Sequence, residues 1–361
     1  MFIVLLLLLI IGLNVYLPWR LNMLLALQHP VWLYILFAAG LVSGLVAMRL
    51  VTKFDNLLVS VYCNLAGTWL GILLYLTCLM LIFELINLIY PLPPVKAGWT
   101  VIILTVIIAA CSLINALSFK VSPVTIPVKG LKNEVKIAQI SDVHLGVARS
   151  KGYLAGIVKK TNELNPDFMV ITGDLVDSKK ALRKDVFSPF QEMQSPVYFV
   201  CGNHDIYVGL DEITKNLKEN NVQILQNEVL ITNGIKLIGL NYMRADDNAR
   251  DPHRVSDETL KDILPTLDLG GDYPKIVLHH VPWGIEYMNE HGVDLVLAGH
   301  THGGQLFPFS LLTKMLFPYN KGLADYKGTF MYVSSGVGTF IVRMRLGTKN
   351  EISLITLVPQ Q

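Results

Sequence analysis

The chain has 361 residues, of which 52% are hydrophobic and 16% are charged, and its formal net charge is +2 at pH 7. It carries no basic stripe with interleaved aromatic residues, so the pattern of a DNA- or RNA-binding protein is absent and no nucleic-acid partner is expected. Cys63, Cys78 and Cys111 lie in predicted membrane stretches and Cys201 is expected to be buried beside the candidate site, which is not the pattern of a disulfide framework.

Residues 1–120 are apolar enough to predict a transmembrane region of about four helices. Each apolar stretch is long enough, or nearly so, to cross a hydrocarbon core of about 30 Å. The first stretch lacks a basic segment and an A-x-A-like cleavage site, which favours a retained helix over a signal peptide. The stretches are about Phe2–Leu17, Val31–Met48, Leu58–Phe83 and Trp99–Phe119, and the first gap holds Pro18, Trp19 and Arg20.

The charges between these stretches predict the orientation of the chain. Four spans place both ends of the region on one side of the membrane, and the positive-inside rule then places the C-terminal domain in the cytoplasm. Glu84, near the end of the third stretch, is expected at the membrane interface, and a functional carboxylate within the membrane is the alternative. The predicted inner side holds Arg49, Lys53, Lys120, Lys129 and Lys132, and the outer side holds Arg20 and Lys96.

Residues 121–134, with Pro123 and Pro127, are predicted to be a linker, and residues 135–361 a single catalytic domain. The first part of this domain alternates between strands and helices. The strands are Val135–Ile140, Phe168–Ile171 and Val197–Val200, and the helices are about Tyr153–Leu164, Val186–Met193 and Leu210–Glu219.

The second part of the domain is richer in strands. Asn233-Gly234 is typical of a tight hairpin turn between two of them. A helix is predicted near Asp257–Ile263. The strands are Val222–Leu225, Glu228–Thr232, Ile235–Leu240, Ile276–Leu278, Leu295–Ala298, Thr329–Ser334, Phe340–Arg345 and Glu351–Leu357.

Short polar motifs follow the strands of this domain. Buried strands that end in such residues converge on one edge of a sheet, where α/β proteins keep their sites. Almost every polar residue in the motifs is a potential metal ligand or acid–base group. The motifs are Asp142-Val143-His144, Gly173-Asp174-Leu175-Val176-Asp177, Gly202-Asn203-His204-Asp205, His279-His280-Val281-Pro282 and Gly299-His300-Thr301-His302.

The ligand types indicate divalent cations rather than a structural zinc site. Carboxylate, amide oxygen and imidazole suit hard and borderline divalent ions, and no thiolate is included. The set is too large for one tetrahedral ion, but it suits two ions that share a carboxylate. The candidate ligands are Asp142, His144, Asp174, Asn203, His280, His300 and His302.

These motifs resemble those of the calcineurin-like metallophosphoesterase superfamily: D-x-H, G-D-x-x-D, G-N-H-D/E, a single His, and G-H-x-H. All occur in the expected order, and the G-H-T-H-G-G-Q form at residues 299–305 resembles a bacterial membrane-associated phosphodiesterase subgroup. The resemblance implies a four-layer αββα sandwich, here preceded by the helical transmembrane region. It also implies two divalent metal ions, either manganese, iron, zinc or a mixture.

The resemblance also implies a role for each residue. Asp142, His144 and His302 would hold the first metal, Asp174 would bridge, and Asn203, His280 and His300 would hold the second. His204 would contact the phosphate and protonate the leaving oxygen. Asp205 would orient His204 by accepting its other ring proton, and Asp177 would hold the turn that carries Asp174.

His279 and His280 are adjacent on a strand and point to opposite faces, so both are not expected to be ligands. The family's single His is followed by one residue and Pro, which selects His280 before Val281-Pro282. His279 is expected to be a buried, hydrogen-bonded core residue.

We therefore expect a membrane-anchored hydrolase that cleaves a phosphodiester, lipid-linked or nucleotide-lipid substrates included, by a metal-activated hydroxide. The alternatives are a phosphatase for soluble phosphoesters and a membrane metal-binding sensor or scaffold without turnover. An apolar loop at residues 303–318 directly follows His302. It either contacts the bilayer or an acyl chain, or it packs as core under the metal-binding loop.

Overall fold

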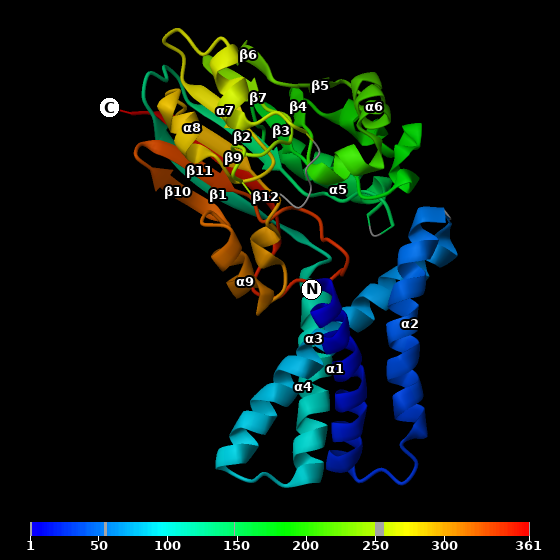
Figure 1. Cartoon of the computed structure of the whole chain (residues 1–361). Coiled ribbons are helices and arrows are strands. Elements are labelled where there is room, and N and C mark those ends of the chain that lie inside the picture. Colours follow the sequence, from blue (N-terminus) through cyan, green and yellow to red (C-terminus); the bar gives the residue numbers. More distant parts are fainter. Residues whose placement is uncertain (1, 54–55, 148, 250–255, 361) are drawn as a thin grey trace. The chain divides into compact units, whose positions relative to one another are not determined.

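A computed structural model of the chain describes residues 2–53, 56–147, 149–249 and 256–360. The chain divides into two compact units (Figure 1). The helical unit comprises Met1–Asn115 with Ile341–Met344, and the sandwich unit comprises Ala116–Phe340 with Arg345–Gln361. The amino-acid composition therefore changes close to the boundary between the two units.

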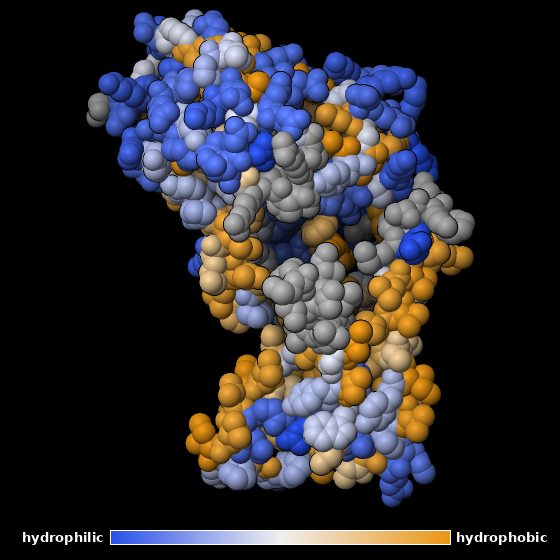
Figure 2. Space-filling view, in the orientation of Figure 1, coloured by the Kyte–Doolittle hydropathy of each residue, from blue (hydrophilic) through white to orange (hydrophobic). Residues whose placement is uncertain are grey.

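The helical unit contains α1 (Phe2–Leu25), α2 (Val31–Lys53), α3 (Leu57–Ile89) and α4 (Pro94–Asn115). The apolar stretches predicted to be helices are helices. Among the described residues, α3 and α4 are long and apolar enough to cross a membrane, and α2 contains a shorter apolar helix, Val31–Ala47. Hydrophobic side chains gather along the surface of α2 (Figure 2).

The gap predicted after the first stretch is wrong, because α1 continues through Pro18 to Leu25. Arg20 therefore lies on a helix and pairs with Glu84 on α3, with Nε 2.5 Å from Oε1 and Nη2 3.0 Å from Oε2. Tyr16 also donates to Glu84, at 2.9 Å. Both charged residues lie within the last two turns of their helices, which agrees with the helix-end position expected for Glu84.

The sandwich unit is built on two six-stranded sheets, ordered β1-β12-β2-β3-β4-β5 and β10-β11-β9-β8-β7-β6. The first contains β1 (Phe119–Val128), β2 (Val135–Ile140), β3 (Phe168–Thr172), β4 (Val197–Val200), β5 (Val222–Ile224) and β12 (Asn350–Pro359). The second contains β6 (Glu228–Thr232), β7 (Ile235–Gly239), β8 (Lys275–Leu278), β9 (Leu295–Ala298), β10 (Gly322–Tyr326) and β11 (Thr329–Val333).

Alternation along the strands separates the layers. On β3, Phe168 and Val170 belong to the core between the two sheets, whereas Met169 and Ile171 belong to the core under the first sheet's helices. Those helices are α5 (Lys151–Glu163) and α6 (Asn203–Glu219), while α7 (Leu260–Ile263) and α8 (Ile285–Glu290) pack on the second sheet. The fold is therefore the predicted αββα sandwich.

The remaining elements are α9 (Phe309–Leu316) and short 3-10 turns. The turns are η1 (Lys179–Leu182), η2 (Lys184–Val186), η3 (Ser188–Glu192), η4 (Leu264–Thr266) and η5 (His302–Gly304). The helix predicted near Val186–Met193 is thus replaced by η2 and η3. The hairpin predicted at Asn233-Gly234 is confirmed, since β6 and β7 pair antiparallel with Thr232 opposite Ile235.

Two other predicted segments differ from the structure. The predicted linker is largely β1, which pairs in parallel with β12 over ten residues. Pro123 and Pro127 are tolerated because β1 is an edge strand and donates hydrogen bonds on one side only. Phe340–Arg345, predicted as a strand, pairs with no strand in the described structure, and Ile341 has a φ of 58°, which interrupts an extended chain.

The strand directions create one functional edge. β2, β3 and β4 run parallel in the first sheet, and β7, β8 and β9 run parallel in the second. Near their carboxyl ends, Gln139 joins the sheets, donating at 2.9 Å both to Thr172 Oγ1 on β3 and to the carbonyl of Ala298 on β9. The residues that follow these strands therefore meet at one place.

Candidate metal centre

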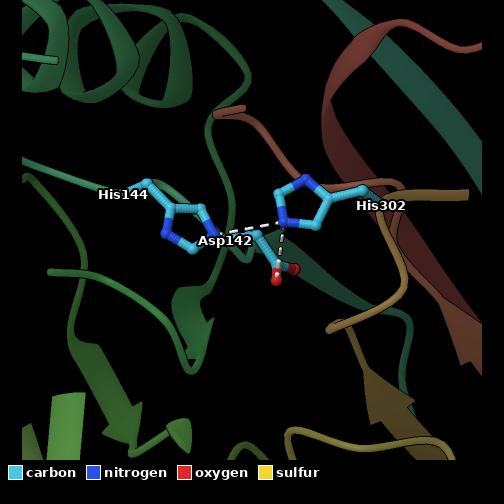
Figure 3. A group of neighbouring side chains, drawn as sticks. All are labelled: Asp142, His144 and His302. Atoms are coloured by element: carbon cyan, nitrogen blue, oxygen red, sulfur yellow. Dashed lines mark hydrogen bonds and ion pairs between the residues drawn. The ribbon is translucent and has the colours of Figure 1, made fainter. Parts of the chain in front are cut away.

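The first cluster contains Asp142, His144 and His302, whose ligand atoms lie within 4.8 Å of one another. His302 Nε2 lies 3.1 Å from His144 Nε2 and 3.4 Å from Asp142 Oδ1 (Figure 3). All three residues are buried. The segments after β2 and β9, far apart in sequence, thus contribute to one pocket of ligand atoms.

The second cluster contains Asp174, His280 and His300. His280 Nε2 lies 3.2 Å from Asp174 Oδ2 and 3.2 Å from His300 Nδ1. The same Asp174 oxygen lies 4.0 Å from His144 Nε2 in the first cluster. One oxygen of Asp174 therefore lies near imidazole nitrogens of both clusters.

The hydrogen bonding around these atoms fits divalent cations. Asn203 Oδ1, at the start of α6, is buried without a hydrogen-bond partner among the described atoms, and such a group is costly unless something else satisfies it. His280 Nδ1 lies 2.8 Å from the carbonyl of Thr172, to which its N–H donates, so Nε2 keeps its lone pair for a ligand bond. The donor set of oxygen and imidazole nitrogen suits two ions.

The backbone is strained at most of these residues. Asp142, His144, Asp174, His300 and His302 have φ values of 53°, 51°, 51°, 69° and 52°. This left-handed region costs a non-glycine residue about 1–2 kcal/mol. Strain of this kind concentrates at functional sites, where the surrounding structure holds it. The unusual backbone conformation, as well as the side-chain type, therefore marks these residues as candidate ligands.

The motif glycines allow the ligand-bearing turns to approach one another. A Cβ on Gly202 would lie 2.2 Å from Asp174 Oδ1, and a Cβ on Gly299 would lie 2.5 Å from Asp142 Oδ2. Both distances are far below van der Waals contact. These positions require glycine because a side chain would occupy the space of a candidate ligand.

His204 lies beside the first cluster, with its ring centroid 4.9 Å from that of His144. Its ring is oriented by Asp177, whose Oδ1 lies 3.0 Å from His204 Nδ1. The predicted orienting role of Asp205 is therefore wrong. Asp205 accepts from the backbone N–H groups of Gly202 and Val176, both at 2.9 Å, and so it holds the turn after Asp174. The two aspartates have exchanged their expected roles.

The charges of the site act strongly on one another. Burial lowers the pKa of His144 and His280, but Asp177 and Asp174 respectively outweigh it and raise both pKa values to about 9. Burial raises the pKa of Asp177, but its hydrogen bonds to His144 and His204 outweigh this and hold that pKa well below its usual value. Burial, followed by the charge of Asp174, raises the pKa of Asp205 to about 7. Protonated imidazoles balance the carboxylates here, as bound cations would.

His279 points away from both clusters. It is fully buried, and its Nδ1 lies 2.8 Å from the carbonyl of Val281. Burial lowers its pKa to about 4, so the ring is neutral. It is absent from both clusters of candidate ligands, in agreement with the core position expected for it.

Two residues near the site, Phe340 and Arg345, were not identified as site residues from the sequence. The guanidinium of Arg345 is fully buried and donates to the carbonyls of His302 at 3.3 Å and of Gly338 at 2.7 Å. The ring of Phe340 lies 5.5 Å from His144 and 5.0 Å from His204, centroid to centroid. Neither residue follows a predicted metal-binding strand, so no motif marks it.

Known proteins were compared with the chain. The sequence profile described as calcineurin-like phosphoesterase matches residues 135–304, a range that contains every candidate ligand. An uncharacterized metallophosphoesterase of Helicobacter pylori is 35% identical over 250 residues, which cover 67% of this chain and 64% of that protein. The chain thus spans about 64% of the length of that relative.

Two further relatives carry more descriptive names. A Bos taurus protein described as a transmembrane protein with metallophosphoesterase domain is 31% identical over 276 residues, which cover 71% of this chain and 61% of that protein. Phosphodiesterase YaeI of Escherichia coli is 28% identical over 239 residues, which cover 62% of this chain and 82% of that protein. With the motifs, the sandwich and the clustered ligands, these similarities show that the chain belongs to the calcineurin-like phosphoesterase family.

Proposed function

We propose that the chain is a membrane-anchored phosphoesterase that binds two divalent metal ions and hydrolyses a phosphodiester. The observation that carries the proposal is the pair of clusters, with Asp174 of the second cluster 4.0 Å from His144 of the first, together with the buried amide oxygen of Asn203 that has no partner among the described atoms. When bound, the two ions would lower the pKa of a water and offset the charge of the phosphoryl oxygens. Manganese, iron and zinc all suit this donor set.

The candidate ligands would be divided between the two ions. Asp142, His144 and His302 would hold the first ion, Asp174 would bridge, and Asn203, His280 and His300 would hold the second.

His204 is the proton donor in this proposal. Its Nδ1–H is directed at the Asp177 carboxylate, so Nε2 is the nitrogen left to face a phosphoryl group. Oriented in this way, His204 would give a proton from Nε2 to the leaving oxygen. His204 is about one-fifth exposed, which leaves it reachable by substrate.

A diester with an apolar part is the substrate class that we favour. The relative YaeI is named a phosphodiesterase. Apolar side chains on and before α9 are 49–82% exposed and form a hydrophobic surface, which we call the α9 patch (Figure 2). A soluble protein seldom exposes such a cluster unless it binds something. The α9 patch consists of Phe307, Phe309, Leu311, Leu312, Met315 and Leu316.

We also propose that α1–α4 anchor the chain with its sandwich unit in the cytoplasm. The helices α3 and α4 and the name of the bovine relative support membrane association. Arg49, Lys120 and Lys129 support the orientation through the positive-inside rule. A reporter fused after the C-terminus, active only on one side of the membrane, tests it. Activity on the outer side would refute this topology.

The activity test uses bis-p-nitrophenyl phosphate and p-nitrophenyl phosphate with purified full-length protein and added manganese. Diester turnover is expected, and His204→Asn should lower it by about 100-fold or more because general acid catalysis is worth 10²–10⁴. His29→Asn changes an exposed histidine of the helical unit and serves as the matched control. Absence of turnover with two metals bound would favour a binding module without catalysis.

A further inference from the structure

A groove of about 470 Å³ opens in the sandwich unit beside Trp283. We call it the Trp283 groove. Its volume lies within the range of small-molecule sites. Most of its described lining is apolar, including Ala249, Pro282, Trp283, Ile285, Leu316 and Tyr319. A larger hollow of about 690 Å³ runs along α5. None of the candidate ligands lines either cavity, but only the Trp283 groove has a described lining residue, Trp283, whose ring lies beside that of a candidate ligand.

The Trp283 groove adjoins the second cluster. Trp283 follows His280 by three residues, and its ring is stacked on Phe317 at 5.5 Å and 10°. The ring centroids of Phe317 and Trp283 lie 5.5 Å and 6.4 Å from that of His300. Trp283 therefore both lines the groove and lies beside the candidate metal ligand His300.

The Trp283 groove is also continuous with the α9 patch. Leu316 lines the groove and is 63% exposed at the end of α9. An apolar path therefore runs from the surface of α9 along Leu316 to Trp283. An ester group near His300 and an apolar chain in the groove can belong to one molecule.

The charged residues in the described lining of the groove, Asp246 and Glu286, are both acidic, which disfavours an anionic occupant. The polar residues of its described lining are Asp246, Asn248 and Glu286, and no Lys, Arg or His accompanies them. Asp246 already accepts hydrogen bonds from Tyr287 Oη at 2.7 Å and from the N–H groups of Asn248 and Ala249. A phosphate or carboxylate would be repelled there, whereas an uncharged alkyl chain would bury the aromatic and aliphatic walls.

We propose that the Trp283 groove binds the alkyl chain of a phosphodiester substrate while its phosphoryl group lies at the metal clusters. This inference rests on the proposed function and names the part of the substrate that this surface selects. The groove would then favour substrates with longer alkyl chains, because each methylene that it buries makes the binding free energy more favourable.

The test is a series of p-nitrophenyl alkyl phosphates from methyl to hexyl, with full-length protein in detergent and added manganese. In the wild type, kcat/KM should rise by about 2- to 4-fold for each buried methylene. Leu316→Gln and Ala249→Phe should flatten this rise, the first by making the wall polar and the second by filling the groove. Ile231→Gln is the matched control, since Ile231 is exposed on β6 and belongs neither to the groove nor to the α9 patch.

The outcomes separate the two proposals. A rise that persists in Ile231→Gln and is lost in both groove variants supports the inference, and circular dichroism spectra equal to that of the wild type show that the variants are folded. A wild type without a rise, or a rise kept in both groove variants, overturns the inference and leaves the proposed function standing. No hydrolysis of any ester by the wild type overturns both.

Discussion

Asp177 places one carboxylate oxygen against two histidine rings, 3.0 Å from His204 Nδ1 and 3.5 Å from His144 Nδ1. One residue thereby fixes the ring orientation of both a proposed proton donor and a candidate ligand. Such outer partners are worth 10–100-fold in affinity or activity. Asp177, His144 and His204 form a third group of potential ligand atoms within 4.8 Å of one another, and the proposed assignment gives Asp177 an orienting role in it.

We predict that Asp177→Asn lowers kcat by about 10- to 100-fold at saturating manganese. The amide keeps the shape of the side chain but removes the carboxylate that accepts from Nδ1 of His204 and orients its ring. Steady-state kinetics with both p-nitrophenyl esters would measure this. Asp247→Asn, at an exposed aspartate outside the site, is the control. A kcat equal in both variants would remove Asp177 from the mechanism.

The raised pKa values of His144 and His280 predict a pH-dependent metal affinity. Both pKa values are about 9, so the rings are protonated at pH 7, and a metal ion binds only the neutral ring. Apparent affinity should therefore rise from pH 6 to pH 8, by up to about tenfold per pH unit for each proton displaced. Titration calorimetry of manganese in two buffers of different ionisation enthalpy counts those protons.

The same shifts have a consequence for stability without metal. A histidine whose pKa is raised by folding stabilises the fold most when it is protonated in both states. The contribution of His144 and His280 is therefore complete below pH 6.5 and is lost as the pH rises to about 9. Metal-free protein should melt at a lower temperature at pH 9 than at pH 6.5, and an opposite trend would contradict the assigned partners.

At the scale of the element, each metal-binding turn is a strand end that glycine allows to approach its neighbour. Gly299 follows β9, and its N–H donates to the carbonyl of His280 at 2.8 Å. A Cβ there would lie 1.8 Å from Ser141 Oγ. The turn after β9 and the turn after β2 therefore pack so closely that no side chain fits at position 299.

We predict that Gly299→Ala reduces metal binding by the first cluster by at least tenfold, because the new methyl group displaces Asp142. Gly156→Ala is the matched control, since nothing lies within 4 Å of its added Cβ and α5 is helical there. That substitution should leave stability equal or raise it by up to about 1 kcal/mol. Metal content by elemental analysis and melting temperature report the two effects. Full metal occupancy in Gly299→Ala would show that the turn can relax.

The elements that could be predicted are those with a strong local pattern. Buried apolar runs followed by Asp, Asn or His identified the strand ends and the residues that gather there, because chain direction places them at one edge. The residues of β1 could not be assigned, since two prolines resemble a linker and only pairing with β12 makes them a strand. The roles of Asp177 and Asp205 depended on turn geometry that no spacing encodes.

At the scale of the whole molecule, the helical unit includes a short segment from the C-terminal part of the chain. Ile341–Met344 belongs to it, and a Cβ on Gly67 of α3 would lie 2.7 Å from the carbonyl oxygen of Ile341. Similarly, a Cβ on Gly71 would lie 2.4 Å from Met344 Sδ. The two units are thus joined by more than one passage of the chain, and a cut near residue 116 does not separate them cleanly.

We predict that residues 116–361 expressed alone are less soluble and melt earlier than the full chain. Val342 and Met344 are buried within the helical unit and would become exposed in this fragment. Val342→Thr with Met344→Gln should reduce aggregation of the fragment, measured by light scattering. If the unmodified fragment were as soluble as the full chain, Val342 and Met344 would be buried in another way in the fragment.

The position of β12 has a consequence for how the protein is made. This strand follows all the ligand-bearing strands in sequence, yet it lies between β1 and β2 and pairs with both. The first sheet therefore cannot connect β1 to β2 until β12 has been synthesised. Premature termination before residue 350 would leave β2 without a neighbour on one side and the first sheet open.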